Sequence, residues 1–113
     1  MKIKTKVVDD VAVIIPHGKL MGPPDTDDLH NEIKSVLGQN IKKIVIDLGH
    51  VKWMNSLGVG ALMSSFASVK NSGGILKLSS MTEKVRSVML IMQLVKVFET
   101  FETYKEAVDS FGE

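Results

Sequence analysis

Short β-branched runs alternate with stretches of helical periodicity along the whole chain, and this alternation is the feature that most limits the possible folds. Strands and helices that follow one another at short intervals favour a mostly parallel or mixed sheet with helices packed on it. The pattern predicts an α/β fold with a mixed four- to five-stranded sheet and about four helices. The chain has 113 residues and no linker or internal repeat, so residues 1–113 are expected to form one domain.

The predicted strands are short and bounded by turn residues. Residues 1–18 are interpreted as a β-hairpin that turns at Asp9 and Asp10, and its second strand is expected to end at Pro16, because proline cannot donate to a sheet ladder. The run Ile44-Val45-Ile46 is typical of a central strand covered on both faces. The expected strands are 3–8, 11–15, 41–48, 75–78 and 97–98, with loops at 18–24 and 49–55.

Four helices are expected from apolar stripes and capping residues. Asp25 and Thr26 can cap the first helix, and Gly38 is expected to stop it. Gly73-Gly74 ends the second. The expected helices are 25–38, 56–72, one that opens at Thr82 and Glu83, and 104–111.

Charge and composition argue against several function classes. A net charge of +1 disfavours a nucleic-acid binder, which normally carries a strong basic excess. The chain has no cysteine, which removes disulfides, thiolate metal sites and a thiol nucleophile and fits a reducing cytoplasm. The N-terminus lacks the apolar region of a signal peptide. The near-continuous apolar stretch 88–95 is much shorter than the ~20 residues of a membrane span. We therefore expect a soluble cytoplasmic protein.

No catalytic constellation stands out. His17, His30 and His50 have no metal-ligand spacing and are expected to be a strand-end, a helix-surface and a solvated loop side chain. The GxSxG nucleophile elbow and the GxxxxGK[ST] phosphate loop are both absent, and Gly58-Val59-Gly60 is too short for a dinucleotide fingerprint. The sequence therefore predicts that the protein is not an enzyme and has no metal or cofactor. A small hydrolase or nucleotide-dependent enzyme is the less favoured alternative.

The passage from Asp47 to Leu62 is the most unusual one in the chain. A strand feeds a loop, and the loop delivers the hydroxyl of Ser56 to a helix N-terminus. Free amides and the positive end of the helix dipole stabilise a phosphate at such a position. Phosphorylation of Ser56 would therefore disturb the fold little and mainly alter the surface. On spacing alone, the simpler interpretation of Ser56 as an N-cap residue is the stronger one.

The same passage resembles the signature of STAS domains, in particular the small stand-alone anti-sigma factor antagonists. In that family an apolar-Met-Asp-Ser-Ser-Gly-Leu-Gly sequence opens the helix, and here the matching residues run from Trp53 to Gly60. The resemblance covers nearly the whole chain. It implies a partner switch in which the unphosphorylated domain binds an anti-sigma factor, itself a serine kinase of the histidine-kinase-like ATPase fold. The kinase then phosphorylates the serine, here Ser56, and a PP2C-type phosphatase resets the switch.

Two residues depart from the family pattern. Asn55 replaces the usual Asp before the acceptor, and Leu57 replaces the usual second Ser or Thr, so Ser56 is the only motif hydroxyl. These departures leave open an alternative: a non-phosphorylated STAS subunit that regulates a transporter ATPase or a signalling scaffold. The family's Gly-x-Gly falls on Gly58 and Gly60, which would let a partner approach closely. The expected partner contacts are Trp53, Met54, Asn55, Leu57, Gly58 and Gly60.

Other residues allow two interpretations. Trp53 suits a partner anchor as well as it suits core packing. The methionines at 54, 63, 81, 89 and 92 are interpreted as core rather than as an adaptable binding surface. The run 88–92 is apolar on more than one helix face, which favours an exposed contact patch over part of it. Ser64 and Ser65 are expected to face solvent.

Overall fold

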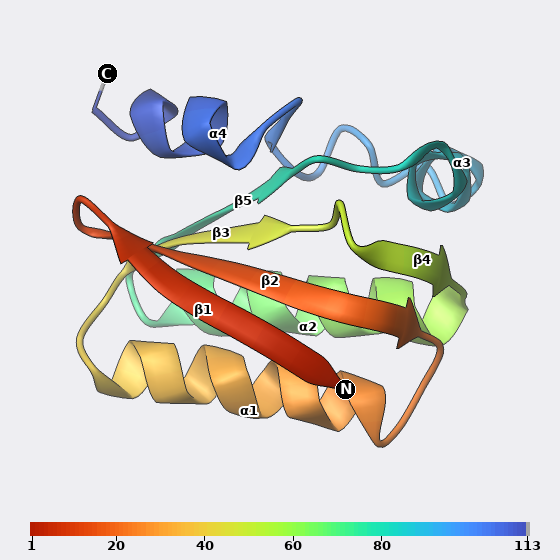
Figure 1. The fold of residues 1–113 in the computed structure, drawn as a ribbon, viewed down its shortest axis with the longest axis horizontal. Coiled ribbons are helices and arrows are strands. Elements are labelled where there is room, and N and C mark those ends of the chain that lie inside the picture. Colours follow the sequence, from red (N-terminus) through yellow and green to blue (C-terminus); the bar gives the residue numbers. More distant parts are fainter. Residues whose placement is uncertain (113) are drawn as a thin grey trace.

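A computed structural model describes residues 1–112 of the chain (Figure 1). The α/β class and the four helices are confirmed, and the order of elements is the predicted one except for an additional strand, β4 (Val51–Met54), which raises the number of strands to six. In chain order the elements are β1 (Lys2–Val8), β2 (Val11–Leu20), α1 (Asp25–Gly38), β3 (Lys43–Asp47), β4 (Val51–Met54), α2 (Ser56–Asn71), β5 (Ile75–Ser79), α3 (Glu83–Ile91), β6 (Thr100–Phe101) and α4 (Tyr104–Ser110).

The strands form one mixed six-stranded sheet in the order β1-β2-β3-β5-β6, with β4 paired to β2. The β1–β2 hairpin is antiparallel and every other pairing is parallel. Ile44 of β3 lies between Ala12 of β2 and Leu76 of β5. The predicted central position of the Ile44-Val45-Ile46 run is therefore confirmed.

Helices cover both faces of the sheet (Figure 1). α1 and α2 lie side by side on one face, where Ile44 and Ile46 contribute to the main core. α4 lies on the opposite face, where Val45 packs in a smaller core with Ala107 and Val108. The alternation of Ile44, Val45 and Ile46 between the two cores follows from the two-residue period of a strand. α3 packs beside β4.

The second strand does not end at Pro16, contrary to the sequence prediction. β2 continues to Leu20, and Pro16 pairs with Ile3 of β1. On its other side β2 pairs with β3 only as far as Ile14 and with β4 only from Gly18. Pro16 lies in the interval between these two pairings, where a residue without an N–H is tolerated.

Segment 49–55 is not wholly a loop. Its residues Val51–Met54 form β4, which pairs in parallel with the end of β2, with a register shift between Gly18 and Lys19. The strand is four residues long, and its two middle residues are both exposed, so it lacks the alternation that identifies a strand. Its partner is the extension of β2 past Pro16, which the sequence did not predict.

Several predicted ends are also wrong. Pro24 occupies the N-cap position of α1 without a side-chain cap, so neither Asp25 nor Thr26 caps that helix. The final edge strand lies at Thr100–Phe101 rather than at 97–98, and Phe98 is instead buried in the main core. Thr82 does cap α3, by accepting a hydrogen bond from the Val85 amide at 3.3 Å.

Candidate functional site

The candidate site lies where β4 leads directly into α2. Ser56 is the first residue of α2, and its side chain is exposed. It is not the N-cap residue, contrary to the simpler interpretation of the sequence. Asn55 has that role: its side-chain oxygen accepts hydrogen bonds from the amides of Leu57 at 3.0 Å and Gly58 at 3.2 Å. Two of the amides expected to be free for a phosphate are therefore already bound.

Asn55 also ties the site to the loop before α1. Its side-chain nitrogen donates a hydrogen bond to the carbonyl oxygen of Met21 at 3.2 Å, and its backbone amide donates to the carbonyl of Leu20 at 3.4 Å. The half-buried Asn55 is thus a positioning residue that fixes the start of α2 against the end of β2. A predicted partner contact at Asn55 has not been tested and stays a prediction.

Gly58 and Gly60 play different parts, although they are two residues apart. A Cβ atom on Gly58 would lie 2.1 Å from the Leu20 carbonyl oxygen and 2.6 Å from Cγ of Met54. Gly58 is buried, so its small size serves packing inside the chain and not the approach of a partner. Gly60 is exposed, and a Cβ there would meet no atom within 4 Å. Only Gly60 offers the open helix surface that was predicted for both.

Exposed apolar side chains surround Ser56. Trp53 is 48% exposed and Leu57 is 57% exposed, so both are available to a partner. Met54 is buried in the main core, so little of its side chain is available to a partner. Met21, which the sequence interpretation did not single out, is 48% exposed. It reaches the site through the Asn55 hydrogen bond, and no sequence signal marks that pairing.

A buried carboxylate supports the segment that leads into β4. Asp47, at the end of β3, accepts hydrogen bonds from the Gly49 amide at 3.0 Å, from Ser79 Oγ at 3.1 Å and from Ser80 Oγ at 2.7 Å. Buried charges persist in proteins when several donors satisfy them. Asp47 therefore joins the ends of β3 and β5 and sets the path of the chain toward Ser56. An Asp directly after a β-branched run is the sequence signal for this role.

The histidines and serines outside the motif give a mixed outcome. His50 is exposed in its loop as expected, but its ring stacks on His17 with centroids 4.4 Å apart. His30 is half-buried rather than solvent-facing, and Ser65 is buried rather than exposed, since both lie between α1 and α2. Ser64 faces solvent as expected. Within residues 1–112, no three His, Asp or Glu side chains gather in a way that could hold a metal ion.

Part of the run 88–92 is exposed, as the sequence predicted. Leu90, Ile91 and Met92 are exposed, whereas Met89 is buried. Met92 is therefore not a core residue, although Met54 and Met89 are, and Met63 and Met81 pack partly buried against the same core.

Across residues 1–112, none of the helices has both the length and the apolar composition that a bilayer crossing requires.

A hollow of about 380 Å³ lies between β4 and α3, and it includes Trp53, which precedes Ser56 by three residues. Trp53 forms one wall, and the Lys84 ammonium lies 3.6 Å from the centroid of its ring, which is a favourable cation–π arrangement. The hollow is lined by Trp53, Met54, Glu83, Lys84, Ser87 and Val88. The site thus combines a half-exposed aromatic side chain, a hollow beside it and, three residues further along the chain, an exposed hydroxyl.

Comparison with known proteins places this arrangement in a family. Residues 2–107 match the family model described as STAS domain. A Thermotoga maritima protein named "Putative anti-sigma factor antagonist" is 31% identical over 88 residues, which is 74% of each chain. A Thermotoga maritima crystal structure with the same description has a TM-score of 0.82 at 27% identity and covers 98% of this chain and 95% of that one.

A more distant likeness supports the fold alone. The phosphorylated form of the Bacillus cell fate determinant SpoIIAA has a TM-score of 0.74 at 20% identity and covers 97% of this chain and 99% of that one.

The family model spans all ten elements except the last residues of α4. The chain therefore belongs to the STAS domain family.

Proposed function

We propose that this chain is an anti-sigma factor antagonist that binds an anti-sigma factor and releases it when Ser56 is phosphorylated. The anti-sigma factor is a serine kinase of the histidine-kinase-like ATPase fold, and a PP2C-type serine phosphatase removes the phosphate. The observation that carries the proposal is the exposed Ser56 hydroxyl at the start of α2, among the exposed side chains of Met21, Trp53 and Leu57. The name of the Thermotoga maritima relative supports the antagonist role.

The proposed action is binding rather than catalysis, and it takes place in the cytoplasm. A phosphate on Ser56 adds about −1.5 to −2 charges, and the positive end of the α2 dipole stabilises it in the free protein. The Leu57 and Gly58 amides are held by Asn55, so they do not draw the phosphate inward. The charge therefore stays on the surface, where it would have to be desolvated against the partner.

The proposed contact surface comprises Trp53, Leu57 and Gly60, with Met21 added from the structure. All four are exposed. Asn55 positions this surface and lies at its edge. Met54 and Gly58 are excluded from it because both are buried.

The test is intact-mass measurement and peptide mapping of the protein recovered from its native host, with Ser56→Ala as the control. One phosphate that maps to Ser56 and is lost in Ser56→Ala would support the proposal. A phosphate on the exposed Ser64 instead would contradict it. A protein that stays unmodified across growth conditions would also contradict it and would favour constitutive binding to a transporter ATPase or a scaffold.

A further inference from the structure

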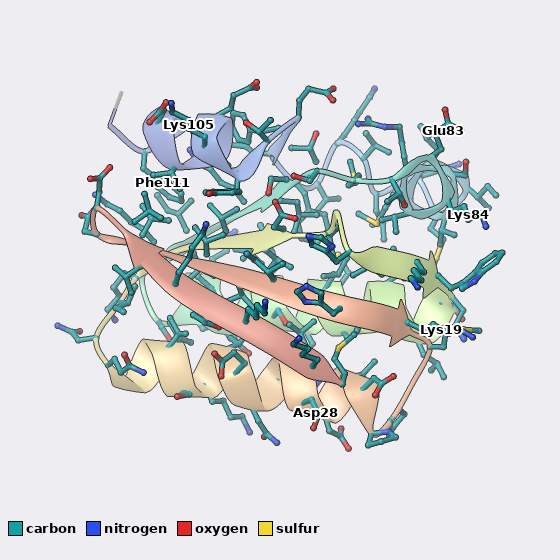
Figure 2. The ribbon with its side chains drawn as sticks, viewed as in Figure 1. Lys19, Asp28, Glu83, Lys84, Lys105 and Phe111 are labelled. Carbon is teal, nitrogen blue, oxygen red and sulfur yellow. The ribbon has the colours of Figure 1, made fainter. Side chains whose placement is uncertain are left out.

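Lysine side chains flank Trp53. Lys52 precedes it on β4, Lys19 is its register partner on β2, and Lys84 of α3 lies over its ring. All three lysines are exposed. Figure 2 shows Lys19 and Lys84 at the same end of the molecule, with Glu83 nearby. We call Lys19, Lys52, Trp53 and Lys84, together with the hollow between β4 and α3, the Trp53 surface.

Among the described residues, the lysines of the Trp53 surface make no ion pair. Within residues 1–112, no carboxylate lies in ion-pair range of Lys19, Lys52 or Lys84. By contrast, Lys43 pairs with Asp10 at 2.8 Å elsewhere in the chain. The charge of Lys19, Lys52 and Lys84 is therefore available to another molecule.

Acidic side chains near this surface do not cancel the positive charge. Glu83 is the one carboxylate that lines the hollow, so three lysines stand against one glutamate. The acids of the first turn of α1 lie beyond Met21, and two of them, Asp25 and Asp28, contact the N-terminal ammonium at 3.3 and 2.6 Å. Since the whole chain carries a net charge of only +1, positive charge is concentrated beside Trp53.

From this arrangement we infer that the Trp53 surface binds an acidic partner segment, one that places an apolar side chain in the hollow and carboxylates against the three lysines. This inference rests on the proposed function and specifies the chemistry of the partner. The hollow supplies apolar contact from Trp53 and Val88. The lysines supply complementarity of charge, which raises association rates and selects among partners.

The same charges explain how Ser56 controls binding. Three lysines and one glutamate give a local charge of +2, and a phosphoserine adds about −1.5 to −2. Phosphorylation of Ser56 would therefore bring the local charge close to zero and place a negative group where carboxylates of the partner approach. Loss of attraction and added repulsion act in the same direction.

The test uses a defined probe: a helical peptide of leucine and glutamate, with a counterpart in which every glutamate is lysine. Binding is followed by the fluorescence of Trp53, the single tryptophan of the chain, and by backbone amide shifts. The glutamate peptide is expected to bind and to shift the amide resonances of β4 and α3. Its affinity is expected to fall as the salt concentration rises. Equal binding of both peptides, no binding of the glutamate peptide, or shifts confined to other elements would overturn the inference.

Charge-reversal variants complete the experiment. Lys19→Glu and Lys84→Glu, each made alone, should weaken binding of the glutamate peptide by roughly tenfold or more. Lys105→Glu is the matched control, because Lys105 is exposed on α4 at the other end of the molecule (Figure 2). A loss of affinity in Lys105→Glu as large as that in Lys19→Glu or Lys84→Glu would overturn the inference. The peptide assay involves no phosphorylation, so it tests the Trp53 surface independently of Ser56. An absent phosphate on Ser56 would refute the proposed function without changing the outcome of the peptide assay.

Discussion

Alanine substitutions at Gly58 and Gly60 should change stability in opposite directions. In Gly58→Ala the new Cβ would lie 2.1 Å from the Leu20 carbonyl oxygen, which is backbone and cannot rotate away. Overpacking of this kind typically costs about 1–3 kcal/mol and occasionally more. The higher helix propensity of Ala than of Gly by itself adds about 0.5–1 kcal/mol of stability. Because the overlap also involves Cγ of Met54 at 2.6 Å, we expect a net loss of roughly 2 kcal/mol.

Gly60→Ala is the matched control on the same helix. A Cβ at Gly60 would meet no atom within 4 Å, so only the gain in helix propensity remains, about 0.5–1 kcal/mol. Urea denaturation followed by far-UV circular dichroism measures both variants against the wild type. If Gly58→Ala were as stable as the wild type, or if Gly60→Ala lost as much stability, the assignment of Gly58 to internal packing would be wrong.

The remaining predictions concern two supports of the site, Asn55 and Asp47, and one ion pair at the β1–β2 turn. Asn55→Ala should lose about 1 kcal/mol of stability with the helix cap, and Asn55→Asp should recover most of it because it keeps the accepting oxygen; thermal melts compare the two. Asp47→Ala should lower the free energy of unfolding by roughly 2–3 kcal/mol, since three donors lose a charged acceptor. Urea denaturation measures this loss, and a change below about 0.5 kcal/mol would show that water replaces the carboxylate. The hydrogen bond from Lys43 holds the pKa of Asp10 below its ordinary value. A lowered folded-state pKa stabilises the fold above the unfolded-state pKa, and this stabilisation is lost as pH falls through the folded-state pKa. In Lys43→Met, carboxyl NMR titration should show the Asp10 pKa rise to its ordinary range, and an unchanged pKa would contradict the contact.

The sequence predicted the class of fold because its strongest signals are local. β-Branched runs and helical stripes mark β3, β5, α1 and α2, and the start of α2 at Ser56 is where the spacing placed it. β4 has no such signal, since it is short and neighbours an unpredicted extension of β2. Its position depends on pairing between residues far apart in the chain, which periodicity does not report.

The candidate site was predictable in its centre and less so in its surroundings. Ser56, Trp53 and Leu57 are exposed, as a contact surface requires, whereas Met54 and Gly58 are buried. A motif gives residue order, but it does not tell which side of a new strand faces the core. Met21 joins the site through the Asn55 side chain, a contact across more than thirty residues that only the folded chain brings together.

The most direct test of the central proposal is the affinity of the anti-sigma factor kinase for the protein in its two states. Calorimetry would compare unmodified protein with protein phosphorylated on Ser56, and Ser56→Ala would serve as the unphosphorylatable reference. We expect the unmodified protein and Ser56→Ala to bind alike and the phosphorylated protein to bind at least about tenfold more weakly. Equal affinity of the phosphorylated and unmodified proteins would contradict a switch at Ser56.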